Sequence, residues 1–272
     1  MPGARQWVGG LLLRSPAPLR LLREVPVLGD WIHRLSHRLV RADEKLWAQV
    51  EAGPARGLWL ELNPRTGQNY LRGCVEPAVQ AMLAEQLRPG TVFYDLGANI
   101  GLFSLLAARI VGATGRVFSF EPDPEVAARL RRNVARNGFS NVTVVEAGVW
   151  SSSGDVYFVP AGASSPDHGT GSFVGSGAAV AGIPVRCVAL DDFIADAPPP
   201  DAIKCDVEGA EVEVLQGAAK LLERHRPWLL CEIHSEANGR AAREFLGRLG
   251  YAVKPVDENH IVASSADRMA RS

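Results

Sequence analysis

Acidic side chains at the ends of apolar runs are the residues of this sequence best placed to do chemistry. Asp95 ends one apolar run, and Glu121 follows another about twenty residues later. Gly97, Asn99 and Gly101 come directly after the first acid, a pattern typical of a strand, a tight glycine turn and a helix. Such a turn leaves bare main chain beside a helix N-terminus, so a ligand can lie against it.

These two acids predict the kind of ligand. A carboxylate just ahead of Gly97 repels a pyrophosphate but suits an ammonium group, which favours an amino-acid ligand over a dinucleotide. An acid at the end of the next strand, here Glu121 followed by Pro122, commonly binds both hydroxyls of a ribose. An amino acid joined to a ribose describes S-adenosylmethionine. The alternative is that Asp95 and Glu121 only cap the helices that follow them.

Polar side chains also close two later apolar runs, Asp206 the first and Glu232 with His234 the second. Because parallel strands end at one edge of a sheet, we expect Asp206 to reach the same crevice as Asp95. His234 is the first candidate for a general base that removes a hydroxyl proton, and Asp206 is the second. Asp206, Glu232 and His234 could instead hold a divalent ion, a use that their loose spacing makes less favoured.

Strands that alternate with helices must position these side chains, and this alternation predicts an α/β fold with a mostly parallel sheet. The end of the third strand, Glu146 and Ala147, would then form a wall for the adenine. The expected strands are 91–95, 116–120, 142–146, 202–205, 228–233, 251–255 and 260–263. The expected helices are 102–111, 125–137, one from Asp206 to about 224, and 236–249.

Two less regular regions flank this core. Ahead of it, apolar pieces at 58–62 and 70–74 predict a β-hairpin, and a helix at 76–87 follows, with Glu76 a candidate to face the ligand. We expect an N-terminal helical extension at 1–57 and an S-adenosylmethionine-binding domain at 58–272. This domain is divided into a leading hairpin and helix (58–90) and the core (91–265).

An inserted pair of strands is predicted at 155–159 and 184–188 from their alternating pattern. The residues between them, 161–182, are rich in Gly, Ser and Ala, and a loop of this length is often functional. We interpret it as a lid over the substrate, with His168 and Ser172 as candidate substrate contacts. A plain insertion without a role is the alternative.

Composition limits the choice of partners. The formal net charge is −1 and 47% of the residues are hydrophobic, so the chain can bury a large core but carries no basic field for nucleic acid. Four separated cysteines form no C-x-x-C motif, which indicates free thiols in a reducing cytosol. No run approaches a membrane span, and we expect a cytoplasmic protein. The amphipathic N-terminal stretch could cover the pocket, form a homodimer or lie on a membrane.

The motifs together resemble the FkbM family of class I S-adenosylmethionine-dependent methyltransferases. The class resemblance rests on the segment 95–101 with Glu121, and the family resemblance on segments 203–211 and 231–234. It implies a seven-stranded Rossmann-like sheet of order 3-2-1-4-5-7-6 with an antiparallel last strand. It also implies the binding residues, with methionine near Asp95, Gly97 and Asn99, ribose on Glu121, adenine near Glu146 and Ala147, and the reacting centre by Asp206. Gly101 and Pro122, which adjoin these residues, complete the candidate cofactor site.

The expected activity is therefore O-methylation of a hydroxyl on a small molecule, such as a natural product or a sugar. Two other functions fit parts of the pattern. A nicotinamide-dependent oxidoreductase would use a similar glycine turn, although Asp95 ahead of Gly97 argues against it. A non-catalytic S-adenosylmethionine-binding subunit would use the N-terminal helices for a partner, and the presence of Asp206 and His234 argues against that.

Overall fold

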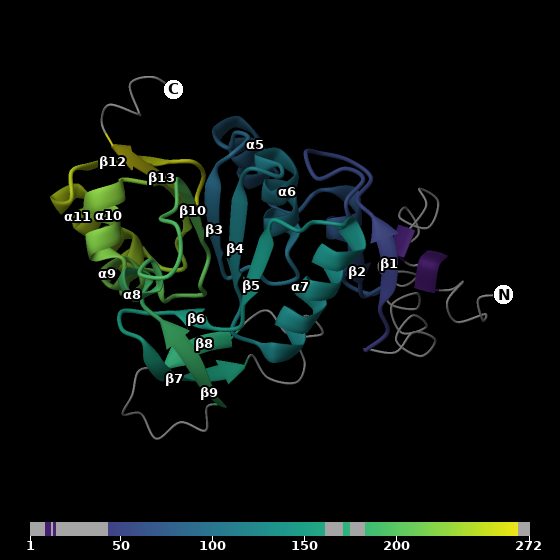
Figure 1. Cartoon of the computed structure of the whole chain (residues 1–272). Helices are drawn as coiled ribbons and strands as arrows, with labels where there is room; N and C mark the ends of the chain where they lie inside the picture. Colours follow the sequence, from purple (N-terminus) through teal and green to yellow (C-terminus); the bar gives the residue numbers. More distant parts are fainter. Residues whose placement is uncertain (1–8, 12, 15–42, 161–170, 175–182, 266–272) are drawn as a thin grey trace. The chain divides into compact units, whose positions relative to one another are not determined.

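The computed structural model describes residues 9–11, 13–14, 43–160, 171–174 and 183–265 (Figure 1). The chain forms two compact units, with residues up to Gln80 in the first and residues from Ala81 in the second. The boundary predicted between residues 57 and 58 lies inside the first unit. Most of the predicted extension and of the predicted lid, and with them the proposed dimer contact, lie outside the described residues.

The first unit contains a short antiparallel pair, β1 (Leu46–Gln49) and β2 (Trp59–Leu62), and the helix α4 (Gln68–Arg72). The predicted hairpin between 58–62 and 70–74 is therefore wrong. The strand β2 pairs with β1, which lies in a stretch expected to be helical. Asn63 accepts the N–H of Arg65 in a turn (2.8 Å), and the chain enters α4 directly afterwards.

The second unit is built on the predicted seven-stranded sheet. Its order is β12-β13-β11-β10-β3-β4-β5, which reads 3-2-1-4-5-7-6 from the β5 edge when the strands are numbered along the chain. Only β13 runs antiparallel to its neighbours. The strands are β3 (Val92–Leu96), β4 (Arg116–Phe120), β5 (Val142–Val145), β10 (Ala202–Cys205), β11 (Trp228–Glu232), β12 (Tyr251–Pro255) and β13 (His260–Ser265).

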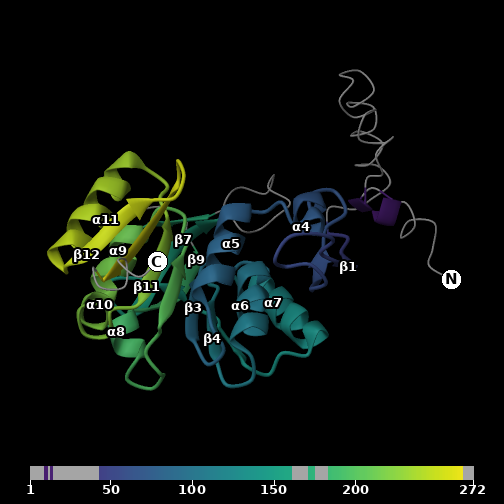
Figure 2. The ribbon, with the colours of Figure 1, turned by 90° about the horizontal axis from the view of Figure 1, so that it is seen from above.

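Helices cover both faces of this sheet. Figure 2 shows α6 (Leu102–Val111) and α7 (Pro124–Asn137) on one face, and α9 (Glu211–Gly217), α10 (Ala219–His225) and α11 (Glu236–Arg248) on the other. The helix predicted to run from Asp206 to about 224 begins only at Glu211 and is divided at Ala218. The remaining helices are α5 (Pro77–Gln86), which spans the division between the units, and the short α8 (Leu190–Phe193).

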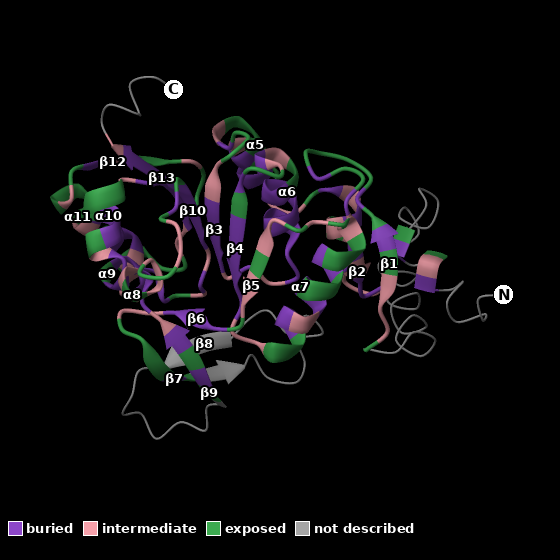
Figure 3. Cartoon of the chain, viewed as in Figure 1, coloured by how far each residue is buried: buried purple, intermediate pink, exposed green. Residues whose placement is uncertain are grey.

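The core lies along the central strands, which are buried on both sides (Figure 3). Phe193 packs edge-on against Tyr94, Phe118 and Phe120, with ring centroids 4.9–5.7 Å apart. Aromatic rings favour this arrangement. Burial of β3 and β10 holds their C-terminal ends in place, and these ends carry Asp95 and Asp206.

The predicted inserted pair belongs to a second sheet of order β6-β9-β7-β8. Its strands are β6 (Gly148–Val149), β7 (Gly154–Pro160), β8 (Gly171–Val174) and β9 (Ile183–Val188). The antiparallel pairing of β7 with β9 confirms the predicted pair. The segment predicted as a loop contains one further strand, β8, which pairs with β7 and includes Ser172. His168 lies outside the described residues.

None of the helices within the described ranges combines the length and apolar character needed to cross a membrane. The four cysteines are free thiols, with Cys74 exposed and the other three buried.

Candidate active site

The glycine turn after β3 is shaped by close packing. Gly97 and Gly101 have φ values of +74° and +90°, and Asn99 between them has φ +49°. A Cβ atom at Gly97 would collide with the carbonyl oxygen of Asp206, and one at Gly101 would collide with the side chain of Leu130. The two glycines therefore let the turn approach β10 on one side and α7 on the other.

Glu121 fastens this turn to the end of β4. Its two carboxylate oxygens accept the backbone N–H groups of Asn99 and Asp123, each at 2.9 Å. The side chain is buried, and burial raises the pKa of Glu121 to about 7 despite these hydrogen bonds. Each carboxylate oxygen has a second lone pair, so Glu121 can still accept hydroxyl groups. Pro122, beside it, is partly exposed.

Asp95 is fully buried. Its Oδ2 accepts the hydroxyl of Ser104 at 2.5 Å, and Ser119 donates in turn to Ser104 at 2.7 Å. The ammonium of Lys204 lies 3.8 Å from its Oδ1. The cation beside Asp95 is thus a lysine of this chain, from the neighbouring strand β10.

Lys204 lies between the carboxylates of Asp95 and Asp206. Its Nζ lies 2.9 Å from Oδ2 of Asp206, and its side chain is only 4% exposed. Burial alone would raise the pKa of Asp206, but the ion pair with Lys204 lowers it below the ordinary value. The other oxygen of Asp206, Oδ1, lies 3.8 Å from Nε2 of His234. Sequence reasoning missed Lys204, although a lysine inside an apolar strand, two residues before an acid, was a usable signal.

His234 is oriented by a buried carboxylate. Its Nδ1 lies 2.7 Å from Oε1 of Glu211, which is fully buried and also accepts from the backbone N–H of Gly209 (2.8 Å) and from Nδ2 of Asn238 (2.7 Å). The hydrogen bond with Glu211 raises the pKa of the imidazole above its ordinary value. Glu211, at the start of α9, therefore anchors the imidazole of His234.

The other ring nitrogen of His234 faces carboxylates. Nε2 lies 3.4 Å from Glu208 and 4.0 Å from Oε1 of Glu232. On the far side of Glu232, Oε2 lies 3.8 Å from Nε2 of His260, whose Nδ1 is held by Asp257 at 2.8 Å. Glu232 therefore lies between two imidazoles, each fixed by its own carboxylate. His260 and Asp257 were not predicted as part of the site, because neither residue belongs to a recognisable motif.

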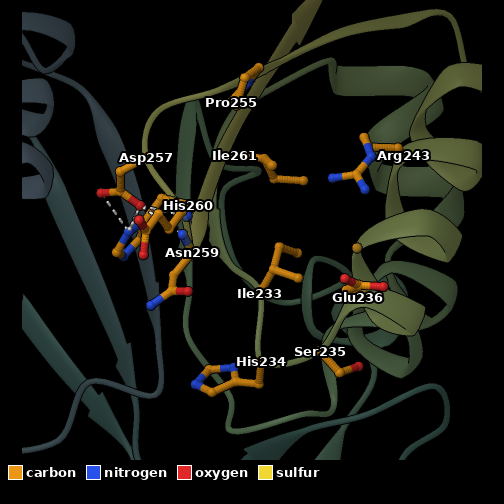
Figure 4. A pocket seen from close by; sticks show the side chains of 12 residues that line it. Ile233, His234, Ser235, Glu236, Arg243, Pro255, Asp257, Asn259, His260 and Ile261 are labelled. Atoms are coloured by element: carbon orange, nitrogen blue, oxygen red, sulfur yellow. Dashed lines mark hydrogen bonds and ion pairs between the residues drawn. The ribbon is translucent and has the colours of Figure 1, made fainter.

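A cavity of about 310 Å³ adjoins this cluster. In Figure 4, the side chain of His234 and the pair of His260 with Asp257 lie on one side, and Ile261 and Arg243 point toward one another on the other side. The C-terminal ends of β11 and the start of β13 thus present polar groups to one side and a partly apolar hollow to the other.

The two residues predicted to form a wall for the adenine differ in their exposure to solvent. Glu146 is exposed and pairs with Arg131 at 2.8 Å, whereas Ala147 is buried. Glu76 belongs to the first unit, where it precedes α5 with φ +40°. Asp95, Gly97, Asn99 and Glu121 lie at the C-terminal ends of β3 and β4, where Glu121 is hydrogen-bonded to Asn99.

The residues predicted for the reacting centre lie close together in the structure. One ligand atom from each of Asp206, Glu232 and His234 lies within 4.8 Å of the others. This arrangement joins the ends of the fourth and fifth strands of the sheet, beside the glycine turn that packs on Asp206.

Comparison with known proteins identifies this architecture. Residues 95–253, more than half of the chain, match the methyltransferase FkbM domain. The chain is 29% identical to the hexuronic acid methyltransferase AglP of Haloferax volcanii, over 84% of this chain and 89% of that protein. It is 43% identical to the 31-O-demethyl-FK506 methyltransferase FkbM of Streptomyces tacrolimicus, over 33% of this chain and 30% of that one.

Among solved structures, the methyltransferase FkbM from Methylobacillus flagellatus is similar with a TM-score of 0.48 and 19% identity, over 74% of this chain and 53% of that chain. The family assignment rests on the domain match, and the fold on the strand order described above. The chain belongs to the FkbM family of S-adenosylmethionine-dependent methyltransferases.

Proposed function

We propose that the chain transfers the methyl group of S-adenosylmethionine to an oxygen of a small molecule, a hydroxyl of a sugar or natural product. The observation that carries this proposal is the contact of the glycine turn with Asp206. This contact brings the turn that would hold the cofactor directly beside the ends of β10 and β11. Glu121, which is bonded to the same turn, would accept the ribose hydroxyls.

Methyl transfer from a sulfonium needs the acceptor oxygen, the methyl carbon and the sulfur in line, and such positioning contributes roughly 7–11 kcal/mol. Asp206 and His234 are the groups at this centre that can hold the acceptor hydroxyl and receive its proton. Gly97, Asn99 and Gly101 would present main chain to the methionine part. Asp95 would act through Lys204 and the turn, because its carboxylate is fully buried.

The names of two relatives support an oxygen atom as the methyl acceptor. AglP is named for a hexuronic acid, and FkbM of Streptomyces tacrolimicus is named for a substrate that lacks a methyl group on an oxygen. A hexuronic acid offers hydroxyls and a carboxyl group. We infer a hydroxyl as the acceptor, in a sugar or a similarly polyhydroxylated compound.

Mass spectrometry tests this function. The purified chain is incubated with S-adenosylmethionine and a panel of uronic acids, neutral sugars and polyhydroxylated macrolides, and each acceptor is examined for the gain of one methyl group. Mild alkali then separates the products, because it hydrolyses a methyl ester and leaves a methyl ether intact. An alkali-stable product supports the proposal, and an alkali-labile one places the methyl on a carboxylate. A chain that binds a nicotinamide cofactor but not S-adenosylmethionine would refute it.

A further inference from the structure

The side chains of Asp206, Glu232 and His234, here called the donor set, meet at the ends of β10 and β11, where one ligand atom from each lies within 4.8 Å of the others. The Nε2 of His234 lies 3.8 Å from Asp206 and 4.0 Å from Glu232, and both distances are too long for hydrogen bonds. Ligand atoms about 2.0–2.2 Å from an ion in tetrahedral geometry lie roughly 3.3–3.6 Å apart. The two distances from Nε2 of His234 therefore exceed the separation expected around a bound ion by less than about 1 Å.

The imidazole is already oriented as a metal ligand. Histidines that bind metals almost always donate the other ring N–H to a carboxylate, which fixes the tautomer. Glu211 fills this role at Nδ1 of His234 (2.7 Å), and Glu211 is itself held by Gly209 and Asn238. These contacts come from the start of α9 and from α11, outside the donor set, and they direct Nε2 of His234 toward Asp206 and Glu232.

Both carboxylates are also divided between a structural partner and the donor set. Asp206 uses Oδ2 for Lys204 at 2.9 Å, which leaves Oδ1 on the side of His234. Glu232 has Oε2 toward His260 and Oε1 toward His234. Each residue of the set thus presents one atom to a common point, and Glu208, 3.4 Å from Nε2 of His234, is a fourth donor close by.

We propose that Asp206, Glu232 and His234 bind a divalent first-row transition-metal ion, with Glu211 as the positioning residue for the imidazole. One imidazole with two carboxylates suits zinc, manganese, cobalt or iron better than calcium. The role of the ion rests on the proposed function. Because Nε2 of His234 would then bind the ion, the ion rather than His234 would favour loss of the proton from the acceptor hydroxyl. It would also offset the negative charge of the cluster when the acceptor is itself acidic.

Cobalt titration tests the site without cofactor or acceptor. The full chain is dialysed against a chelator, which is then removed, and Co²⁺ binding is followed by visible absorption and by calorimetry. We expect one ion per chain, with affinity at least tenfold weaker in His234→Gln and Glu232→Gln, and roughly 10–100-fold weaker in Glu211→Gln. His225→Gln, which changes an exposed histidine at the end of α10, should bind like the parent.

Circular dichroism melts show whether each variant is folded, and only folded variants are compared. The site is refuted if the parent does not bind Co²⁺, or if folded His234→Gln and Glu232→Gln both bind it as the parent does. Methyl transfer is measured separately. Transfer that persists unchanged after chelation would refute the role of the ion and leave the proposed function standing, whereas Co²⁺ binding in a chain that methylates nothing would do the reverse.

Discussion

Gly97 lies directly against the main-chain carbonyl of Asp206, and a Cβ atom at position 97 would collide with that oxygen. This contact joins the turn that would hold the cofactor to the strand end that would hold the acceptor. A small movement at either residue changes the distance between the two substrates. The contact therefore has consequences for both stability and activity.

Gly97→Ala should be strongly destabilising. The left-handed conformation at φ +74° costs an alanine about 1–2 kcal/mol, and the collision adds about 1–3 kcal/mol. Gly138→Ala is the matched control, because Gly138 has φ +71° and nothing within 4 Å of an added Cβ. Urea unfolding of the two variants isolates the collision. Equal losses would show that the packing on Asp206 is not tight.

Cofactor affinity should depend on pH through Glu121, whose pKa is raised to about 7 by burial. Ribose hydroxyls that donate to the carboxylate favour its ionised form, so binding should release a proton near neutral pH. Affinity should therefore rise as pH increases toward about 7 and level off above it. Calorimetry in two buffers with different ionisation enthalpies measures the proton released.

Glu121→Gln provides the control for this titration, because its amide stays neutral. Charge-assisted hydrogen bonds contribute roughly 1.5–3 kcal/mol each, so the variant should bind S-adenosylmethionine more weakly at pH 8 and release no proton. Proton release of the same size in parent and variant would assign the titration to another group and remove the ribose role of Glu121.

The buried ion pairs of Lys204 should be important for folding. Lys204→Met leaves Asp95 and Asp206 without their cation, and the loss of one partner from a buried pair costs about 3–5 kcal/mol. Arg248→Met removes an exposed pair with Glu244, whose side chains are 65% and 72% exposed, and should cost less than about 1 kcal/mol. Similar unfolding midpoints for the two variants would contradict the structural role of Lys204.

His234→Ala should separate catalysis from binding. Removal of a group that takes part in proton transfer lowers kcat by roughly 10²–10⁴, whereas the affinity for S-adenosylmethionine should stay near that of the parent because Glu121 and the glycine turn are intact. His225→Ala serves as the surface control and should keep full turnover. A His234→Ala variant with parental kcat would move the chemistry to Asp206 or to positioning alone.

Most of the fold was predictable because each core strand is a short apolar run closed by a turn or an acid. The strand β4 at 116–120 and the helix α6 at 102–111 match the predictions. The first unit was less predictable, because residues 70–74 are too few to show a helical or an alternating period. Pairing of β2 with β1 depends on contacts that no local pattern records.

The site was predictable to the extent that it consists of strand ends. Asp206, Glu232 and His234 follow from the rule that parallel strands end at one edge. Glu211 could not be assigned in advance, because an acid at a helix N-terminus is favourable in any protein. Its complete burial and its hydrogen bond to His234 depend on tertiary packing. The placement of the His260–Asp257 pair beside Glu232 depends on it as well.

Transfer of a labelled methyl group shows which atom of the acceptor is methylated. The parent chain is incubated with S-adenosylmethionine carrying a deuterated methyl group and with the hydroxyl-bearing acceptors, and the products are analysed by fragmentation mass spectrometry. We expect a deuterated methyl ether on one hydroxyl oxygen of a polyhydroxylated acceptor. In the Asp206→Asn variant this product should be lost while cofactor binding persists. A folded parent chain that binds the cofactor and labels nitrogen or carbon of its acceptor, or that leaves every hydroxyl unlabelled, would contradict this expectation.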